Sequence, residues 1–165
     1  MSGRTAAGAG MRAIGFWVLL SLAAAGCGVP DLCVDDSPSF ATIHQCVLKT
    51  SCAAFSSCHA AAGHQGGLDL QTDTDTARLY DALINSPCTN AVAKSNGWKR
   101  VVPGDPGASY LLSKLTLPNS KEALGAGTGG PNGGLGDRMP DTGQTLDSRS
   151  IAQITAWIKM GAPNN

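Results

Sequence analysis

The sequence predicts an all-α domain built from short helices that are joined by long loops. Apolar residues recur at helical spacing in four separate segments, whereas no segment shows the alternation of apolar and polar residues that a half-buried strand requires. The 165 residues include 21 glycines and 9 prolines, a content typical of extended turns and loops. So few helical turns leave a small apolar core, and we therefore expect a covalent or cofactor staple to stabilise the fold.

The first two helices are predicted at residues 39–49 and 74–86. Ser39 is a suitable N-cap for the first helix, and Thr74 or Asp75 is suitable for the second, which Pro87 ends. Between the helices, residues 51–67 have no helical period and are rich in Cys, His and Gly, so we expect a loop arranged around a site. A short extended piece follows at 68–70. The apolar residues that define the two helices are Phe40, Ile43, Val47, Leu48, Leu79, Leu83 and Ile84.

The last two helices are predicted after Asp105-Pro106 and after residues 147–148. Proline is favoured in the first turn of a helix, and either Asp147 or Ser148 can cap the final one. The glycine-rich segment 125–136 between them is expected to be an exposed loop. Gly161 and Pro163 end the final helix. The apolar faces consist of Tyr110, Leu111, Leu112 and Leu115 in the third helix, and of Ile151, Ile154, Trp157 and Ile158 in the fourth.

The N-terminus is predicted to be a bacterial lipoprotein signal peptide, residues 1–26. Arg4 and Arg12 precede an apolar segment that is too short to span a bilayer permanently. Small residues then lead to Cys27, which resembles the acylated cysteine of bacterial lipoproteins, although Ala24 stands where that signal usually has Leu. An ordinary secretory signal, with Cys27 available for a disulfide, is the alternative. Either signal delivers the mature domain outside the cytoplasm, where disulfides persist.

Two parts are expected after the signal peptide. Residues 27–39 are acidic, contain two prolines and show no apolar period, so we interpret them as a lipidated, flexible tether. Residues 40–165 form one domain. The sequence thus predicts a lipid-anchored protein of the bacterial cell envelope, at the outer membrane.

Composition and motifs exclude several function classes. Twelve basic and twelve acidic residues give no excess of positive charge for nucleic-acid phosphates. The glycine-rich segment 125–136 lacks the Gly-Lys-Ser/Thr ending of a phosphate loop, and no Gly-x-Ser-x-Gly nucleophile motif is present. Glu122 is the only glutamate. No hydrolytic or transferase site is visible, so we expect an electron carrier or a binding module, not an enzyme.

Two short motifs carry the chemistry. Cys58-His59 follows the first helix, and Arg138-Met139-Pro140 precedes the last one. In this arrangement the chain resembles the class I cytochromes c, in which a Cys-x-x-Cys-His motif follows the N-terminal helix. The resemblance implies haem c bound through Cys58, with His59 as proximal and Met139 as distal ligand of the iron. These donors suit the role, since imidazole is a strong iron donor and a soft thioether favours Fe(II).

A closer resemblance is to the cytochrome-c-like domains of bacterial lipoproteins of the planctomycete and myxobacterial type. Those domains share a series of short motifs that covers residues 40–163. Jointly they are specific, although each one alone is weak. In this chain they are Ser51-Cys52, Cys58-His59, Gly67-Leu68-Asp69-Leu70, Val102-Pro103-Gly104-Asp105-Pro106, Ser109-Tyr110-Leu111, Met139-Pro140 and Trp157-Ile158-Lys159-Met160-Gly161-Ala162-Pro163.

The chain departs from the class I pattern at the haem-attachment motif. Phe55 stands where the first attachment cysteine belongs, so the usual pair of thioethers is impossible. Cys52 is separated from Cys58 by five residues in place of two. A single thioether through Cys58 is chemically feasible. We also expect His44 to face solvent and His64 to be an ordinary loop residue, although His64 could form a weak metal site with His59.

The expected pairing of the cysteines depends on whether Cys58 holds haem. With Cys27 acylated, five cysteines remain, which allows two disulfides and one cysteine left over. If Cys58 holds haem, the consistent pairing is Cys33–Cys46 with Cys52–Cys88. Without haem, Cys58 would pair with Cys52 or Cys88.

Two functions are therefore weighed. The first is an envelope-anchored haem protein that passes single electrons to a redox partner protein. The second is a haem-free domain of the same fold, stapled by disulfides, which acts as a binding or structural module.

Overall fold

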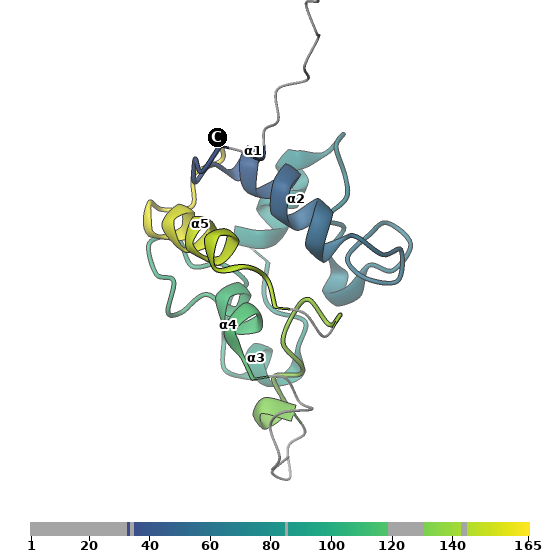
Figure 1. The fold of residues 1–165 in the computed structure, drawn as a ribbon. Helices are drawn as coiled ribbons and strands as arrows, with labels where there is room; N and C mark the ends of the chain where they lie inside the picture. The colour runs from purple at the N-terminus through teal and green to yellow at the C-terminus, as the bar shows by residue number, and fades with distance from the viewer. Residues whose placement is uncertain (1–32, 34, 85, 119–130, 143–144) are drawn as a thin grey trace, which may run out of the picture.

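The computed structural model describes residue 33 and residues 35–84, 86–118, 131–142 and 145–165. Within these ranges the chain forms helices and no strand, apart from the isolated bridges Pro87–Lys99 and Lys99–Ser109. This confirms the helical class (Figure 1). The signal peptide, Cys27 and residues 119–130 lie outside the described residues. The elements are α1 (Phe40–Ile43), η2 (His44–Cys52), η3 (Gln65–Gly67), α2 (Thr76–Ile84), α3 (Ala91–Ser95), α4 (Tyr110–Thr116), η4 (Pro131–Gly134) and α5 (Ser148–Lys159).

Three of the predicted helix starts are confirmed. The Ser39 hydroxyl accepts a hydrogen bond from the Thr42 amide at 3.1 Å, and α1 then continues into the wider turns of the π-helix η2. Asp75 caps α2 through the Arg78 amide at 3.2 Å, and Asp147 caps α5 through the Ser150 amide at 2.9 Å. Each cap satisfies an amide that has no partner within the first helical turn.

The predicted start of the third helix is wrong. Pro106 lies in a turn, in which the Asp105 carboxylate accepts from the Ala108 amide at 3.0 Å, and α4 begins only at Tyr110. The five-residue helix α3 is an element that the sequence analysis missed. It is too short to show a period, but its cap was visible, because the Asn90 side chain accepts from the Ala93 amide at 2.9 Å.

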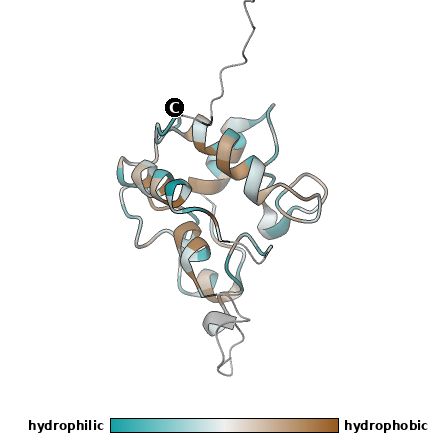
Figure 2. Ribbon diagram, viewed as in Figure 1, coloured by the Kyte–Doolittle hydropathy of each residue, from teal (hydrophilic) through white to brown (hydrophobic). Residues whose placement is uncertain are grey.

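The core consists of buried apolar residues that come mainly from α1, η2, α2, α4 and α5. The ribbons of these helices include hydrophobic stretches (Figure 2). Trp157 is fully buried and stacks on Phe40, with ring centroids 5.7 Å apart. Its indole Nε1 donates to the Pro163 carbonyl at 2.9 Å. The C-terminus closes this side, because the Ala41 amide donates to the Asn165 carbonyl at 2.9 Å (Figure 1).

The structure corrects the prediction for His44. The side chain is 1% exposed, it stacks on Phe40, and its Nε2 lies 3.2 Å from the Leu70 carbonyl. A carbonyl can only accept, so Nε2 is the protonated nitrogen. Burial, the largest effect, lowers the pKa of His44 below its ordinary value of 6.5 despite this hydrogen bond. His44 is thus a neutral core residue that fastens the Leu70 segment to η2.

We expect acid to destabilise the protein through this histidine. The unfolded chain takes up a proton near pH 6.5, whereas folded His44 resists protonation, so the free energy of unfolding falls as the pH drops below that value. Urea unfolding from about pH 7 to about pH 5 measures the slope. His44→Gln, which can still donate to Leu70, is expected to flatten it, and an unchanged slope would contradict this origin.

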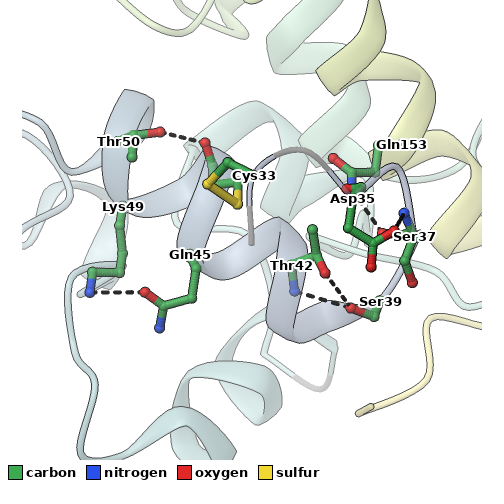
Figure 3. The surroundings of a disulfide bond; sticks show 10 residues. Cys33, Asp35, Ser37, Ser39, Thr42, Gln45, Lys49, Thr50 and Gln153 are labelled. Carbon is green, nitrogen blue, oxygen red and sulfur yellow. Dashed lines mark hydrogen bonds between the residues drawn. A yellow bond between two sulfur atoms is a disulfide. The ribbon is translucent and has the colours of Figure 1, made fainter. Parts of the chain in front are cut away.

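A disulfide attaches the N-terminal segment to the helices. Cys33 and Cys46 are bonded, with their Cα atoms 5.2 Å apart (Figure 3). Gln153 of α5 donates to the Ser37 carbonyl at 2.8 Å, and Arg149 pairs with Asp36. Residues 33 and 35–39, predicted to be part of a tether, therefore lie on the domain. A cross-link of this loop length contributes about 3 kcal/mol to stability.

Candidate functional site

A cavity of about 720 Å³ opens between the Cys/His loop, α4 and the segment that carries Met139. This volume lies within the range of roughly 300–1,000 Å³ that is usual for ligand and cofactor sites. Leucines from five segments form its apolar walls, and a smaller number of polar groups converge on it. Besides the leucines, the lining includes Cys52, Cys58, His59, Cys88, Asn90, Arg100, Tyr110, Lys114, Gly136, Asp137 and Met139.

His59 lines the cavity, and its hydrogen bonds determine which ring nitrogen carries the hydrogen. Its backbone amide donates to the Cys52 carbonyl at 3.3 Å, and its own carbonyl accepts from the Leu70 amide at 2.7 Å, so both ends of the residue are held. Its Nδ1 lies 2.7 Å from the Gln65 carbonyl. Since that oxygen can only accept, Nδ1 carries the hydrogen, and Nε2 of the neutral ring keeps a free lone pair.

Electrostatics keep this imidazole neutral. Burial lowers the pKa of His59 below 6.5, and the positive charges of Arg100 and Lys114 lower it further, against the opposing effect of the Gln65 hydrogen bond. A neutral ring with an unprotonated Nε2 is the form that ligates a metal ion. The hydrogen bond through Nδ1 also fixes the orientation of the ring.

A close approach of backbone holds the loop around His59. A Cβ atom added to Gly63 would lie 2.4 Å from the Cys58 carbonyl oxygen and 2.6 Å from the Ser57 carbonyl carbon. Neither backbone atom can move freely, because the Cys58 carbonyl also accepts from the Gln65 amide at 3.2 Å. Any side chain at position 63 would therefore push the loop out of its path.

Met139 reaches the same cavity from the opposite end of the domain sequence. The residue is partly buried against the core, and its amide donates to the Lys114 carbonyl at 2.7 Å. The Lys114 ammonium donates to the Leu135 carbonyl at 3.2 Å and also to the Asp137 carbonyl. Lys114 thus fastens the segment that carries Met139 to α4 at three points.

Two further side chains hold the same segment, and together with Lys114 we call them the clamp of the Met139 segment. Asn90 donates to the Gly134 carbonyl at 2.9 Å, and the Tyr110 hydroxyl donates to the Leu135 carbonyl at 2.9 Å. Gly136 has a φ of +79°, and a Cβ there would lie 3.3 Å from Lys114 Nζ. The positive φ favours glycine at this position, and a larger residue would also displace the Lys114 ammonium by a few tenths of an ångström.

Removing the clamp is expected to loosen the Met139 segment. Lys114→Met keeps the apolar stem but deletes two hydrogen bonds from a charged donor, each typically worth about 1.5–3 kcal/mol. We expect amides within 133–140 to exchange hydrogen at least about tenfold faster by mass spectrometry. Lys94→Met, at an exposed residue of α3, is the matched control. Equal exchange in the two variants would contradict the role of Lys114.

Three cysteine thiols line the cavity. Cys52, Cys58 and Cys88 are all unbridged, so the implied Cys33–Cys46 bond is present, whereas the accompanying Cys52–Cys88 bond is not formed. Burial, followed by the proximity of Cys58, raises the pKa of the Cys52 thiol to about 11. Burial also raises the pKa of Cys88. Both groups therefore remain protonated thiols at neutral pH, and protonated thiols oxidise slowly.

Two charged residues at the cavity, Arg100 and Asp137, differ in their hydrogen bonding. Arg100 is 9% exposed and donates to the Ala82 carbonyl at 2.8 Å and to the Gly66 carbonyl at 2.7 Å. It thereby joins the end of α2 to the loop of His59. Asp137 Oδ1 is buried and has no hydrogen-bond partner within the described residues.

Several residues of the motifs and candidate sites recognised in the sequence are absent from the cavity lining. Phe55 is 58% exposed and Met160 is 55% exposed. His64 points to solvent near Asp69, at 3.9 Å, and in the described part of the chain no three His, Cys, Asp or Glu side chains group as metal ligands. A smaller hollow of about 270 Å³ lies beside the disulfide, but its Asp36 and Asp147 are already engaged by Arg149 and the α5 cap.

The chain matches no protein-family model, no curated protein and no solved structure. Within the described ranges, the helices are too short or too polar to cross a membrane. The assignment of a function therefore rests on the chemistry of the cavity.

Proposed function

We propose that the protein is an envelope-anchored, cytochrome-c-like haem protein that transfers single electrons to a partner protein. His59 would be the proximal ligand through Nε2, Met139 the distal ligand, and Cys58 a thioether attachment. The observation that carries the proposal is the meeting of His59, Cys58 and Met139 at one cavity, although the sequence separates the first two from Met139 by about eighty residues.

The donor set suits a haem. His59 offers an unprotonated nitrogen, Met139 offers a soft sulfur, and Cys58 offers a thiol. The leucine walls would shield a planar macrocycle from water, and the volume is adequate for a cofactor. These features support the cytochrome-c-like interpretation of the helical fold.

Each residue has a defined part in such a protein. The bond from His59 Nδ1 to Gln65 would hold the ring in one orientation during oxidation and reduction, which keeps reorganisation small. The thioether of Met139 would favour the reduced iron and raise the potential, and burial would raise it further. Haem, when bound, supplies the one-electron chemistry.

The test is an ultraviolet–visible spectrum of the secreted mature protein, produced in a host that matures c-type cytochromes. We expect a Soret band, a positive pyridine haemochrome assay and a mass gain of one haem on the denatured chain. A colourless protein without that mass gain would overturn the proposal. It would leave the haem-free, disulfide-stapled binding or structural module as the function of this fold.

A further inference from the structure

The loop before Cys58 accommodates the five residues that separate Cys52 from Cys58. Helix η2 ends at Cys52, and the five residues up to Cys58 form an outward turn in which the Cys58 amide donates to the Phe55 carbonyl at 3.0 Å. Positions 54–57 of this turn are exposed, and Phe55 itself is 58% exposed. The extra residues are therefore taken up on the solvent side.

After this turn the chain comes back to Cys52, at the end of η2. The His59 amide donates to the Cys52 carbonyl at 3.3 Å, so the residue after Cys58 touches the backbone of Cys52. Both thiols line the cavity that holds His59. The five-residue spacer thus leaves Cys52 and the Cys58-His59 pair adjacent along the backbone, and all three residues line the cavity.

We propose that Cys52 is a second covalent attachment site for haem, alongside Cys58. This inference rests on the proposed function. The Cys52 thiol would add across one vinyl group of the macrocycle while Cys58 adds across the other. In each addition the sulfur bonds to one vinyl carbon, the thiol hydrogen goes to the other, and the double bond becomes single. Nothing leaves, and no external oxidant or reductant is needed.

The state of Cys52 agrees with this role. Its thiol is unbridged and half-buried at the cavity, so it is available to form a thioether. Cys88 also lines the cavity, but it follows α2 in the sequence, and its amide donates to the Trp98 carbonyl at 3.5 Å, outside the Cys52–His59 turn. Cys88 therefore serves as a matched control thiol.

Peptide mapping of the wild-type protein tests the proposal directly. Trypsin cleaves after Lys49 and Arg78, so Cys52 and Cys58 fall in one peptide and Cys88 in the next. After denaturation and alkylation, we expect the 50–78 peptide to carry one haem and no alkyl group. One haem with one alkyl group would overturn the role of Cys52 while leaving the proposed function intact. A peptide without haem would overturn both.

The variants give a second readout that does not depend on the native fold. The pyridine haemochrome is recorded on denatured protein, and its α band moves to longer wavelength for each vinyl group left unreacted. Cys52→Ser is expected to retain covalent haem with a shifted α band, whereas Cys88→Ser keeps the wild-type band. An identical band in Cys52→Ser and wild type would exclude a thioether at Cys52.

Discussion

Under the proposed haem function, replacing His59 by alanine is expected to abolish the native Soret spectrum. Among the described residues, His59 is the only histidine that lines the cavity, and its Nδ1 is already bonded to the Gln65 carbonyl, which leaves Nε2 as the donor atom. Without it, any attached haem would lose its strong axial donor, and reduced samples would show the spectrum of a five-coordinate or solvent-ligated iron. Ultraviolet–visible spectra of oxidised and reduced protein measure the change.

His64→Asn is the matched control for this experiment. His64 belongs to the same loop, lies at φ +44°, and does not line the cavity. Asparagine tolerates this left-handed conformation better than most residues, so the substitution removes an imidazole with little strain. We expect a wild-type spectrum from it. A spectrum of His59→Ala that matches this control would remove His59 from the haem site.

The largest expected effect on stability is that of Trp157→Ala. The substitution deletes a fully buried indole, its stack on Phe40 and its hydrogen bond to Pro163. Such truncations typically cost about 3–5 kcal/mol. Since small domains have a total stability of roughly 5–15 kcal/mol, the variant would be close to unfolding at room temperature. Urea titration followed by circular dichroism measures the loss.

Trp98→Ala controls for the removal of a tryptophan as such. Trp98 is 36% exposed and contacts Tyr110 with ring centroids 6.0 Å apart. We expect a loss of about 1 kcal/mol or less there. If Trp157→Ala does not fold, Trp157→Phe keeps most of the apolar contact and loses the Nε1 donor, and it is expected to fall between the two. Equal losses in Trp157→Ala and Trp98→Ala would contradict the place of Trp157 in the core.

Local chemistry made parts of the fold predictable. Side chains that cap helices act within three residues, so the sequence alone identified Ser39 as a cap and narrowed the cap of α5 to Asp147 or Ser148, of which Asp147 is the one observed. His44 could also have been assigned to the core, because it lies four residues after Phe40 and three before Val47 on one helical face. Its polarity misled the prediction, since the Leu70 carbonyl that satisfies it is distant in sequence.

The site was only partly predictable for a related reason. His59 and Met139 could be singled out by their motifs, but the clamp of Lys114, Asn90 and Tyr110 acts on carbonyl groups, which no side-chain pattern reveals. The position of Cys52 was missed because residue counting treats a spacer as if it ran straight. The outward turn at Phe55 makes that assumption fail.

The Cys33–Cys46 disulfide also limits the length of chain between the expected lipid anchor and the domain. If Cys27 bears the lipid, six residue steps join the anchor to the bridge, and at about 3.5 Å per step they extend no more than about 20 Å. With residues 35–39 free, twelve steps would extend about twice as far. The cross-link would then limit the distance between the domain and the lipid surface to about one molecular diameter. Under the proposed function, a redox partner would have to approach the surface equally closely.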